Sequence, residues 1–182
     1  QVTITRATGS LTLPSRFMLV CAMNPCRCGW YGHPSGRCRC SARQVEQYMR
    51  RISGPLLDRI DMHVEVPSVE YEAMRRKEQP ESSAAVRQRV NAAREVQKRR
   101  FAGTSVTCNA YMTPAMIGQY CQLDAAGERL MQGAFDRLGL TGRSHDRILR
   151  MARTIADLYG AEDIQSQHLA EAIQYRSSTL LK

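Results

Sequence analysis

One apolar run near the start of the chain restricts its possible folds more than any other feature. Residues 17–23 read FMLVCAM without a polar or charged side chain, and the run ends at Asn24 and Pro25. An unbroken apolar run of this length is typical of a β-strand buried on both faces, as in the sheets of α/β proteins. Such sheets place ligand sites beyond the carboxyl ends of their strands, and proline restricts the residue before it. Asn24 is therefore a candidate site residue.

Four cysteines follow at once and form two close pairs. Each pair has one residue between its cysteines, and a loop rich in turn-forming residues separates Cys26 and Cys28 from Cys38 and Cys40. Zinc prefers about four soft ligands at tetrahedral angles, which two such pairs can supply. The pattern favours a structural zinc site, and His33 could replace one thiolate. Reduced free thiols and disulfides are the alternative interpretations.

A second informative stretch, residues 53–61, reads SGPLLDRID. A cap serine followed by glycine and proline predicts the start of a short helix, and this helix carries Arg59. The apolar and polar residues that come next, 62–66, predict a second strand.

Together, the sequence Met23-Asn24-Pro25-Cys26, the cysteine pairs and residues 53–61 resemble the Mg-chelatase-like AAA+ ATPases of the ComM/YifB type. The similarity runs over almost the whole chain. Members of that family have a phosphate-binding glycine loop that ends in Gly-Lys-Ser/Thr and an acidic Mg-binding motif, and neither occurs in this sequence. The expectation is a C-terminal part of such an ATPase, which would not hydrolyse ATP by itself.

The resemblance implies a mainly α fold with a small β part. Residues 1–67 would be the remnant of an AAA+ α/β core, with a hairpin, two strands and the cysteine loop. Residues 68–81 would be a linker, and residues 82–182 a helical lid. In the family, a central strand leads into the phosphate loop between the two predicted strands. Without it, the two strands are not expected to pair directly, and their bare edges could be disordered, rearranged or swapped with another chain.

The second half shows strong helical periodicity with clear start and stop signals. Ser82 or Ser83, Thr113 with Pro114, Asp124 and Ser166 are predicted to cap four helices, and Gly139 to end one of them. A further helix over residues 143–159 has a predicted buried face that includes Ile148, Ala152 and Tyr159. These helices predict a small bundle with its own core.

The resemblance also implies roles for two residues near the start. Asn24 corresponds to sensor 1, which holds the attacking water or contacts the γ-phosphate, although its amide could instead cap the strand end. Arg59 corresponds to the arginine finger, which reaches the nucleotide of a neighbouring subunit. The competing interpretation is a salt bridge from Arg59 to Asp58 or Asp61.

Other arginines are candidates for phosphate or DNA contacts. Arg143, Arg147 and Arg150 fall on one stripe of the predicted helix, opposite its buried face. The family places its sensor 2 arginine near the start of this helix, so Arg143 is the first nucleotide-binding candidate and Arg147 the second. A solvated helix face explains the stripe equally well. The resemblance implies that the predicted hairpin corresponds to one that points into the central pore of related ring motors. Arg6, near its tip, is therefore the DNA-binding candidate, and an ordinary edge hairpin with a solvated arginine is the alternative.

The composition indicates which classes of binding partner and which cellular compartment to expect. The net charge is +9, with 26 lysines and arginines against 17 acidic residues, which favours phosphate-rich partners such as DNA. No apolar run reaches the length of a membrane span and no secretory signal is visible, so no membrane partner is expected. Seven cysteines in such a chain indicate a reducing, cytoplasmic location.

For the whole protein, the resemblance implies a homohexameric motor that uses ATP and Mg²⁺ to promote branch migration of DNA. A magnesium-inserting chelatase subunit would share the same engine and act on a porphyrin-binding partner. A non-enzymatic zinc module that binds nucleic acid would use the cysteines and the basic charge without ATP.

Overall fold

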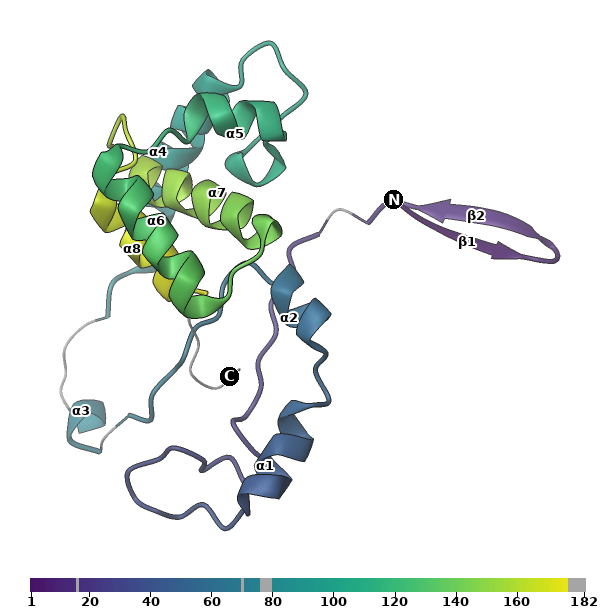
Figure 1. Ribbon diagram of the computed structural model, residues 1–182, viewed down its shortest axis with the longest axis vertical. Helices are drawn as coiled ribbons and strands as arrows, with labels where there is room; N and C mark the ends of the chain where they lie inside the picture. Colours follow the sequence, from purple (N-terminus) through teal and green to yellow (C-terminus); the bar gives the residue numbers. More distant parts are fainter. Residues whose placement is uncertain (16, 70, 76–79, 177–182) are drawn as a thin grey trace. The chain divides into compact units, whose positions relative to one another are not determined.

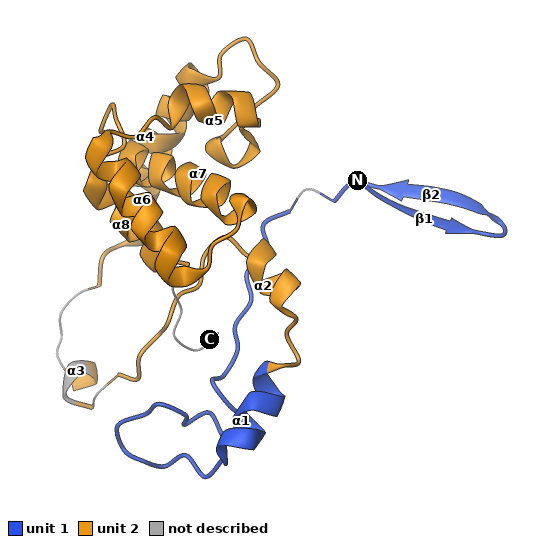
Figure 2. Cartoon of the chain, in the orientation of Figure 1, with its two compact units in different colours: residues 1–49 blue, residues 50–182 orange. Residues whose placement is uncertain are grey.

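The computed structural model describes residues 1–15, 17–69, 71–75 and 80–176. It divides into two compact units, residues 1–49 and residues 50–182 (Figure 2). Helices dominate the described residues, and the sheet found among them is one two-stranded hairpin (Figure 1). The fold is therefore mainly α with a small β part, as the sequence predicted. No helix in the described part of the chain is long and apolar enough to cross a membrane.

Unit 1 begins with the predicted hairpin. Strand β1 (Val2–Arg6) pairs antiparallel with β2 (Gly9–Leu13), and Arg6 lies opposite Gly9 at the turn. The hydroxyls of Thr3 and Thr12 meet across the strands at 3.0 Å. Every residue of both strands is exposed, so the hairpin has no buried face within the described chain.

The rest of unit 1 is the cysteine loop, defined here as residues 26–40, and helix α1 (Ala42–Met49). Ser41 caps this helix: its hydroxyl accepts a hydrogen bond from the Gln44 amide, while the Gln44 side chain accepts one from the Ser41 amide. This reciprocal pair is a capping box with glutamine in the third position. Val45 is the buried residue of the helix.

The two buried strands predicted for residues 17–23 and 62–66 are not present. Both segments lack regular secondary structure, and Val20 and Val66 are 82% and 85% exposed. A strand is stable when neighbouring strands satisfy its backbone N–H and C=O groups. Among the described residues, β1 and β2 pair with each other and no other strand is available. An apolar run of this kind forms a buried strand only between neighbouring strands, and the described residues contain none beside it. The strand prediction is therefore wrong here.

Unit 2 contains all the described helices after α1. They are α2 (Gly54–Arg59), α3 (Tyr71–Arg75), α4 (Ser83–Arg100), the 3-10 turn η1 (Asn109–Tyr111), α5 (Pro114–Tyr120), α6 (Ala125–Leu138), α7 (Gly142–Leu158) and α8 (Ser166–Gln174). The predicted caps Ser82, Thr113 and Asp124 each accept a hydrogen bond from a backbone amide of the first turn. Gly139 ends α6 with a φ of 60°. The prediction for Ser166 is wrong by one residue, because Gln165 is the cap and forms a capping box with His168.

Helix α7 is the centre of the core. It packs against α4, α5 and α8 (Figure 1) and against η1. Ile148, Ala152 and Ala156 on its inner face are completely buried. Tyr159, predicted to be on this face, is 68% exposed. Tyr159 is the C-cap of α7, and its amide still donates to the Ile155 carbonyl at 3.0 Å, so its backbone follows the helical period. The prediction of burial is nevertheless wrong for this residue, which lies at the helix end where Gly160 turns the chain with a positive φ.

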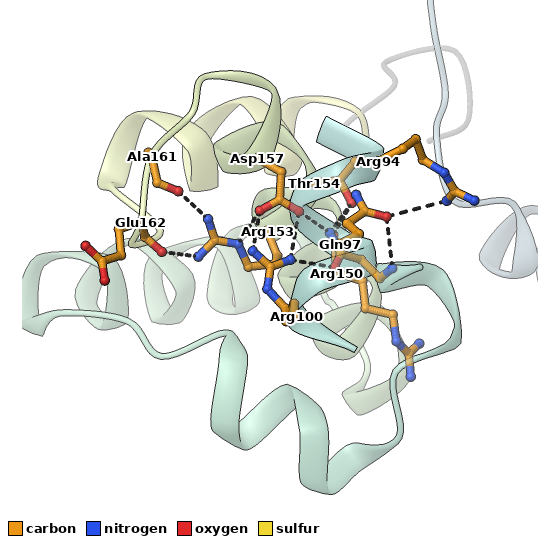
Figure 3. A network of polar contacts seen from close by, with 10 residues as sticks. Arg94, Gln97, Arg100, Arg150, Arg153, Thr154, Asp157, Ala161 and Glu162 are labelled. Atoms are coloured by element: carbon orange, nitrogen blue, oxygen red, sulfur yellow. Dashed lines mark hydrogen bonds and ion pairs between the residues drawn. The ribbon is translucent and has the colours of Figure 1, made fainter. Parts of the chain in front are cut away.

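A buried polar network ties α4 and η1 to α7 (Figure 3). The Asp157 carboxylate accepts hydrogen bonds from Arg100 at 2.8 Å, from the Asn109 side-chain amide at 2.8 Å and from Arg153 at 3.2 Å. Arg153 also donates to the carbonyl oxygens of Ala161 and Glu162, both at 2.7 Å. Each buried charge therefore has an opposite charge or carbonyl partners, which offsets the cost of its desolvation.

Candidate functional site

The first candidate site is built around residues 58–61, at the end of α2. Ser53 caps this helix by accepting a hydrogen bond from the Leu56 amide at 3.3 Å, and Pro55 lies in its first turn. The helix ends where Ile60 becomes extended. Arg59 is exposed, and its guanidinium donates to the Pro55 carbonyl at 2.9 Å, one turn earlier.

Asp58 is held from two sides by the helical bundle. The Ser144 hydroxyl in the first turn of α7 donates to the Asp58 carboxylate at 3.0 Å, and so does the Arg176 guanidinium at 3.0 Å. Arg176 also donates to the carbonyl oxygens of Asp58 and Ile60. Only 5% of the Arg176 side chain is exposed, so this charge lies within the packing between the segment and the bundle.

Arg147 of α7 also binds the segment 58–61. Its guanidinium donates to the Arg59 carbonyl and forms an ion pair with Asp61 at 2.6 Å. Asp58 and Asp61 thus bind other arginines, and the interpretation in which one of them pairs with Arg59 does not match the structure. The result is a fixed backbone at residue 59 whose guanidinium faces solvent.

The predicted arginine stripe on α7 serves three different purposes. Arg147 binds residues 59–61, and Arg150 donates to the Met112 carbonyl at 2.9 Å. Arg143 lies in the first turn of the helix, is exposed, and contacts no acidic side chain among the described residues. Arg143 is therefore the member of the stripe whose guanidinium is open to an incoming anion.

Sequence reasoning missed Arg176, Ser144 and His63. The His63 amide donates to the Tyr175 carbonyl at 2.7 Å, which extends the contact between this segment and the end of α8. Burial lowers the pKa of His63, and the positive charge of Arg176 lowers it further, so the ring is neutral at pH 7. Arg176 and Asp58 are 118 positions apart, and no local pattern reports a contact at that distance.

The cysteine loop in unit 1 is the second candidate site. Its four sulfur atoms lie within 4.8 Å of one another, with 3.3 Å between Cys26 and Cys28 and 3.8 Å between Cys26 and Cys38. Sulfur ligands about 2.3 Å from a tetrahedral zinc ion are roughly 3.8 Å apart. Cys26, Cys28, Cys38 and Cys40 therefore fit a tetrahedral soft-metal site with little movement.

The loop backbone favours this arrangement. Gly29, Gly32 and Gly36 all have positive φ values, which the tight turns between the cysteine pairs require. Hydrogen bonding from the backbone of Trp30 and Arg39 lowers the pKa of Cys28 to about 6. A hydrogen bond from the Cys40 backbone lowers the pKa of Cys38, but desolvation and the Cys28 and Cys26 thiols outweigh it and raise that pKa to about 11. Within the quartet, Cys28 is therefore favoured as a thiolate ligand.

Two predicted site residues lie elsewhere in unit 1. Asn24 is exposed beside the cysteine loop, where a Cβ added to Gly29 would lie 3.9 Å from the Asn24 Cγ atom. Arg6 is exposed at the end of β1, next to the hairpin turn. Neither side chain contacts an acidic side chain among the described residues.

This chain supplies only part of a nucleotide-binding site. No Gly-Lys-Ser/Thr loop is present to hold the phosphates and position Mg²⁺. Arg59 and Arg143 offer solvent-facing guanidiniums, which suit contacts to phosphate oxygens, but they do not form a nucleotide cradle.

Comparison with known proteins covers both units. Residues 80–176 match the family model of the magnesium chelatase subunit ChlI C-terminal region, and residues 1–74 match that of magnesium chelatase subunit ChlI. Competence protein ComM of Haemophilus influenzae is 39% identical over 182 residues, which is 100% of this chain and 35% of that protein. The uncharacterized protein YifB of Escherichia coli is 39% identical over 97% of this chain and 34% of its own length.

A more distant relative from Mycobacterium bovis, an uncharacterized protein, is 33% identical over 98% of this chain and 35% of its own length. The chain thus spans about a third of the length of these curated relatives. The match extends from the hairpin through the cysteine loop and residues 58–61 to the last helix. On this evidence, the chain belongs to the Mg-chelatase-like family defined by magnesium chelatase subunit ChlI, to which the ComM and YifB proteins are similar.

Proposed function

We propose that this chain is the C-terminal part of a ring-forming, Mg²⁺-dependent AAA+ ATPase that couples ATP hydrolysis to movement and branch migration on DNA. Family membership supports the ATPase. The name of the H. influenzae relative refers to competence, the capacity to take up DNA, and the net charge of +9 suits such a partner. Bound Mg²⁺ would supply positive charge that stabilises phosphoryl transfer, and the acidic motif and phosphate loop that would hold it do not occur in this sequence.

The observation that carries the proposal is that the backbone around Arg59 is held in place while its side chain is exposed. Its backbone is held by Arg147, and its neighbours Asp58 and Ile60 are held by Arg176, while its own guanidinium remains exposed. An arginine finger needs this combination, because it must reach the γ-phosphate of an adjacent subunit without losing position. We therefore assign Arg59 to catalysis in trans.

Asn24 and Arg143 complete the proposed phosphate contacts. Asn24 would orient the attacking water, and Arg143 would bind phosphate from the start of α7. Arg147, the second nucleotide-binding candidate, is engaged with Asp61, so we propose that its contribution is to position Arg59. Because α7 holds both Arg143 and Arg147, phosphate binding at one would be transmitted to the segment that the other holds.

We propose zinc as the metal of the cysteine loop, with a structural role. Four thiolates on one Zn²⁺ leave surplus negative charge, and Arg27, Arg37 and Arg39 lie beside the ligands in sequence and are exposed. All seven cysteines are free thiols, which agrees with a cytoplasmic location.

The assembly that we propose is a homohexamer that contacts DNA, with Arg6 on the hairpin as one contact. We also propose that residues 68–81 link an N-terminal part, residues 1–67, to a helical lid, residues 82–182. The two family models support this division, because one ends at residue 74 and the other begins at residue 80.

The family description itself favours a second candidate function. A magnesium chelatase subunit would use the same ATPase site while acting on a porphyrin-binding partner. ATP turnover of the whole protein that is stimulated by DNA would favour the DNA motor. Turnover that responds only to a porphyrin-binding partner would favour the chelatase.

The decisive experiment measures ATP hydrolysis by the full-length protein that contains this chain. Arg59→Ala should reduce the rate by about a thousandfold, whereas Arg51→Ala, another exposed arginine of the same unit, should leave it nearly unchanged. Mixing Arg59→Ala subunits with subunits that lack the phosphate-loop lysine should restore activity, since each supplies what the other lacks. Unchanged turnover by Arg59→Ala would refute the assignment.

A further inference from the structure

An aromatic and basic cluster stands on the surface of the cysteine loop and has no part in the proposed ATPase chemistry. Trp30 is 38% exposed and Tyr31 is 46% exposed. The Arg37 guanidinium lies over the Trp30 ring, 5.1 Å from its centroid, and the His33 ring contacts Trp30 edge-on at 4.8 Å. Large exposed aromatic side chains on a loop without a core require an explanation.

The cluster is ordered before any ligand arrives. His33 Nδ1 accepts a hydrogen bond from the Ser35 amide at 3.0 Å and lies 2.6 Å from the Ser35 hydroxyl. The cysteine pairs fix both ends of the loop, and Arg37 holds the tryptophan ring by a cation–π contact. A pre-ordered aromatic surface loses less conformational entropy when it binds a partner.

The charge around this cluster has one sign. Residues 1–45 contain no aspartate or glutamate, and the loop with its flanks carries four exposed arginines: Arg27, Arg37, Arg39 and Arg43. Even with four thiolates on one zinc ion, which leaves two surplus negative charges, these arginines keep the region positive. An acid-free basic surface attracts phosphates and gains no contact from basic partners.

From these observations we infer that the cysteine loop is a binding site for single-stranded DNA, with bases stacked on Trp30 and Tyr31 and phosphates paired with the surrounding arginines. This inference rests on the proposed function, since it names the surface that contacts DNA. Aromatic rings interleaved with arginines are the chemistry that binds single strands, where unpaired bases expose their faces. In a duplex, those faces are stacked and a side chain on a loop cannot reach them.

The chain supplies its own probe, because Trp30 is its one tryptophan. We would titrate the zinc-loaded chain with fluorescein-labelled oligothymidine, following tryptophan emission with an unlabelled oligomer and anisotropy with the labelled one. Stacking should quench Trp30 emission over the same concentrations at which anisotropy rises. A duplex of matched length should bind more weakly and quench little.

Substitutions separate stacking from charge. Trp30→Ala should weaken binding by about tenfold or more, whereas Trp30→Phe should largely restore it, because phenylalanine keeps a face for stacking. Arg39→Ala should reduce the dependence of log affinity on log salt by roughly 0.7, the amount expected for one lost phosphate contact on a single strand. The control Arg99→Ala changes an exposed arginine of α4 and should leave affinity within about twofold. An unchanged zinc content shows that the loop variants keep the cysteine site, and an unchanged helical circular dichroism shows that Arg99→Ala is folded.

The outcomes distinguish the inference from the proposed function. If anisotropy reports binding but Trp30 emission is constant and Trp30→Ala binds normally, DNA binds elsewhere and the inference fails alone. If matched duplex binds equally and quenches equally, the single-strand assignment is wrong. If no DNA binds and DNA does not stimulate the full-length ATPase, the DNA part of the proposed function fails as well.

Discussion

The cysteine loop and the helical bundle are ordered in different ways. In the bundle, apolar side chains from α4 to α8 close around Ile148 and Ala152, and the buried charges are neutralised within it. The cysteine loop has no such core: of its residues, only Cys26 is buried. Its shape comes from tight turns and from four sulfur atoms within 4.8 Å of one another.

The comparison indicates that the two regions lose their structure in different ways. A packed core loses its contacts together, so the bundle is expected to unfold as a whole. A loop held by a few ligands can lose its order by itself when the metal leaves. The following predictions test whether the two regions are independent, in order of expected effect.

Removal of the proposed zinc ion should have the largest effect, confined to the cysteine loop. Structural zinc sites bind with apparent free energies on the order of 10 kcal/mol, so Cys38→Ser or a strong chelator should eliminate this stabilisation. The expected result is loss of about one zinc per chain and rapid proteolysis within residues 26–40, while the helical circular dichroism is maintained. Cys21→Ser, outside the quartet and exposed, should keep its zinc. Collapse of the helical signal would show that the regions are not independent.

Asp157→Ala should have the largest effect on the bundle. It leaves the buried Arg153 and the largely buried Arg100 without their shared carboxylate, which costs about 3–5 kcal/mol in the free energy of unfolding. Denaturant titration followed by circular dichroism measures the loss, and zinc content should not change. Asp163→Ala removes an exposed carboxylate nearby in sequence and should alter stability by less than about 0.5 kcal/mol. Equal effects of the two variants would contradict the structural role of the network.

Asp58→Ala should release residues 58–61 from the bundle without unfolding it. Arg176 then loses its carboxylate partner, at a cost of about 1–3 kcal/mol in local stability. Hydrogen exchange of the His63 amide, which donates to Tyr175, should accelerate by about tenfold or more. Asp61→Ala breaks a more exposed ion pair and should have a smaller effect. No change in His63 exchange would show that this contact does not depend on Asp58.

The folding stability of the bundle is expected to depend modestly on pH because of His168. Burial lowers its pKa below the ordinary value, and Arg153 contributes to this shift, so the unfolded chain binds the proton more readily. Stability is therefore complete above about pH 6.5 and falls as the pH decreases through the lowered folded-state pKa, by at most about 1.4 kcal/mol per pH unit. His168→Gln preserves the capping-box geometry and should flatten this slope. An unchanged slope between pH 7 and 5 would assign the effect to other groups, with His63 the first to test.

Sequence reasoning succeeded where the signal is local. Thr113 and Asp124 cap their helices and Gly139 ends α6, because each depends on hydrogen bonds or backbone angles within a few residues. Sequence reasoning failed where a segment can form its structure only by pairing with residues far away in the sequence. Residues 17–23 have the composition of a buried strand, but no neighbouring strand is present among the described residues.

The candidate sites show the same division. Cys26, Cys28, Cys38 and Cys40 were assigned together from spacing, and their sulfur atoms do lie together, because a short loop joins them. Asp58 was noted only as a possible partner of Arg59. Its actual partners, Ser144 and Arg176, come from α7 and the end of α8.

The amino-acid sequence by itself determined the helices of the bundle, the meeting of the four thiols and the family to which the chain belongs. The tertiary structure alone decided how the arginines are divided. Arg100 and Arg153 neutralise the buried Asp157 carboxylate, and Arg176 pairs with the partly exposed Asp58. Arg147 and Arg150 hold neighbouring backbone, whereas Arg59 and Arg143 remain exposed. A guanidinium is long and binds any acceptor within its reach. Its role therefore depends on which carboxylates and carbonyl groups folding brings beside it, and one-dimensional spacing does not contain that information.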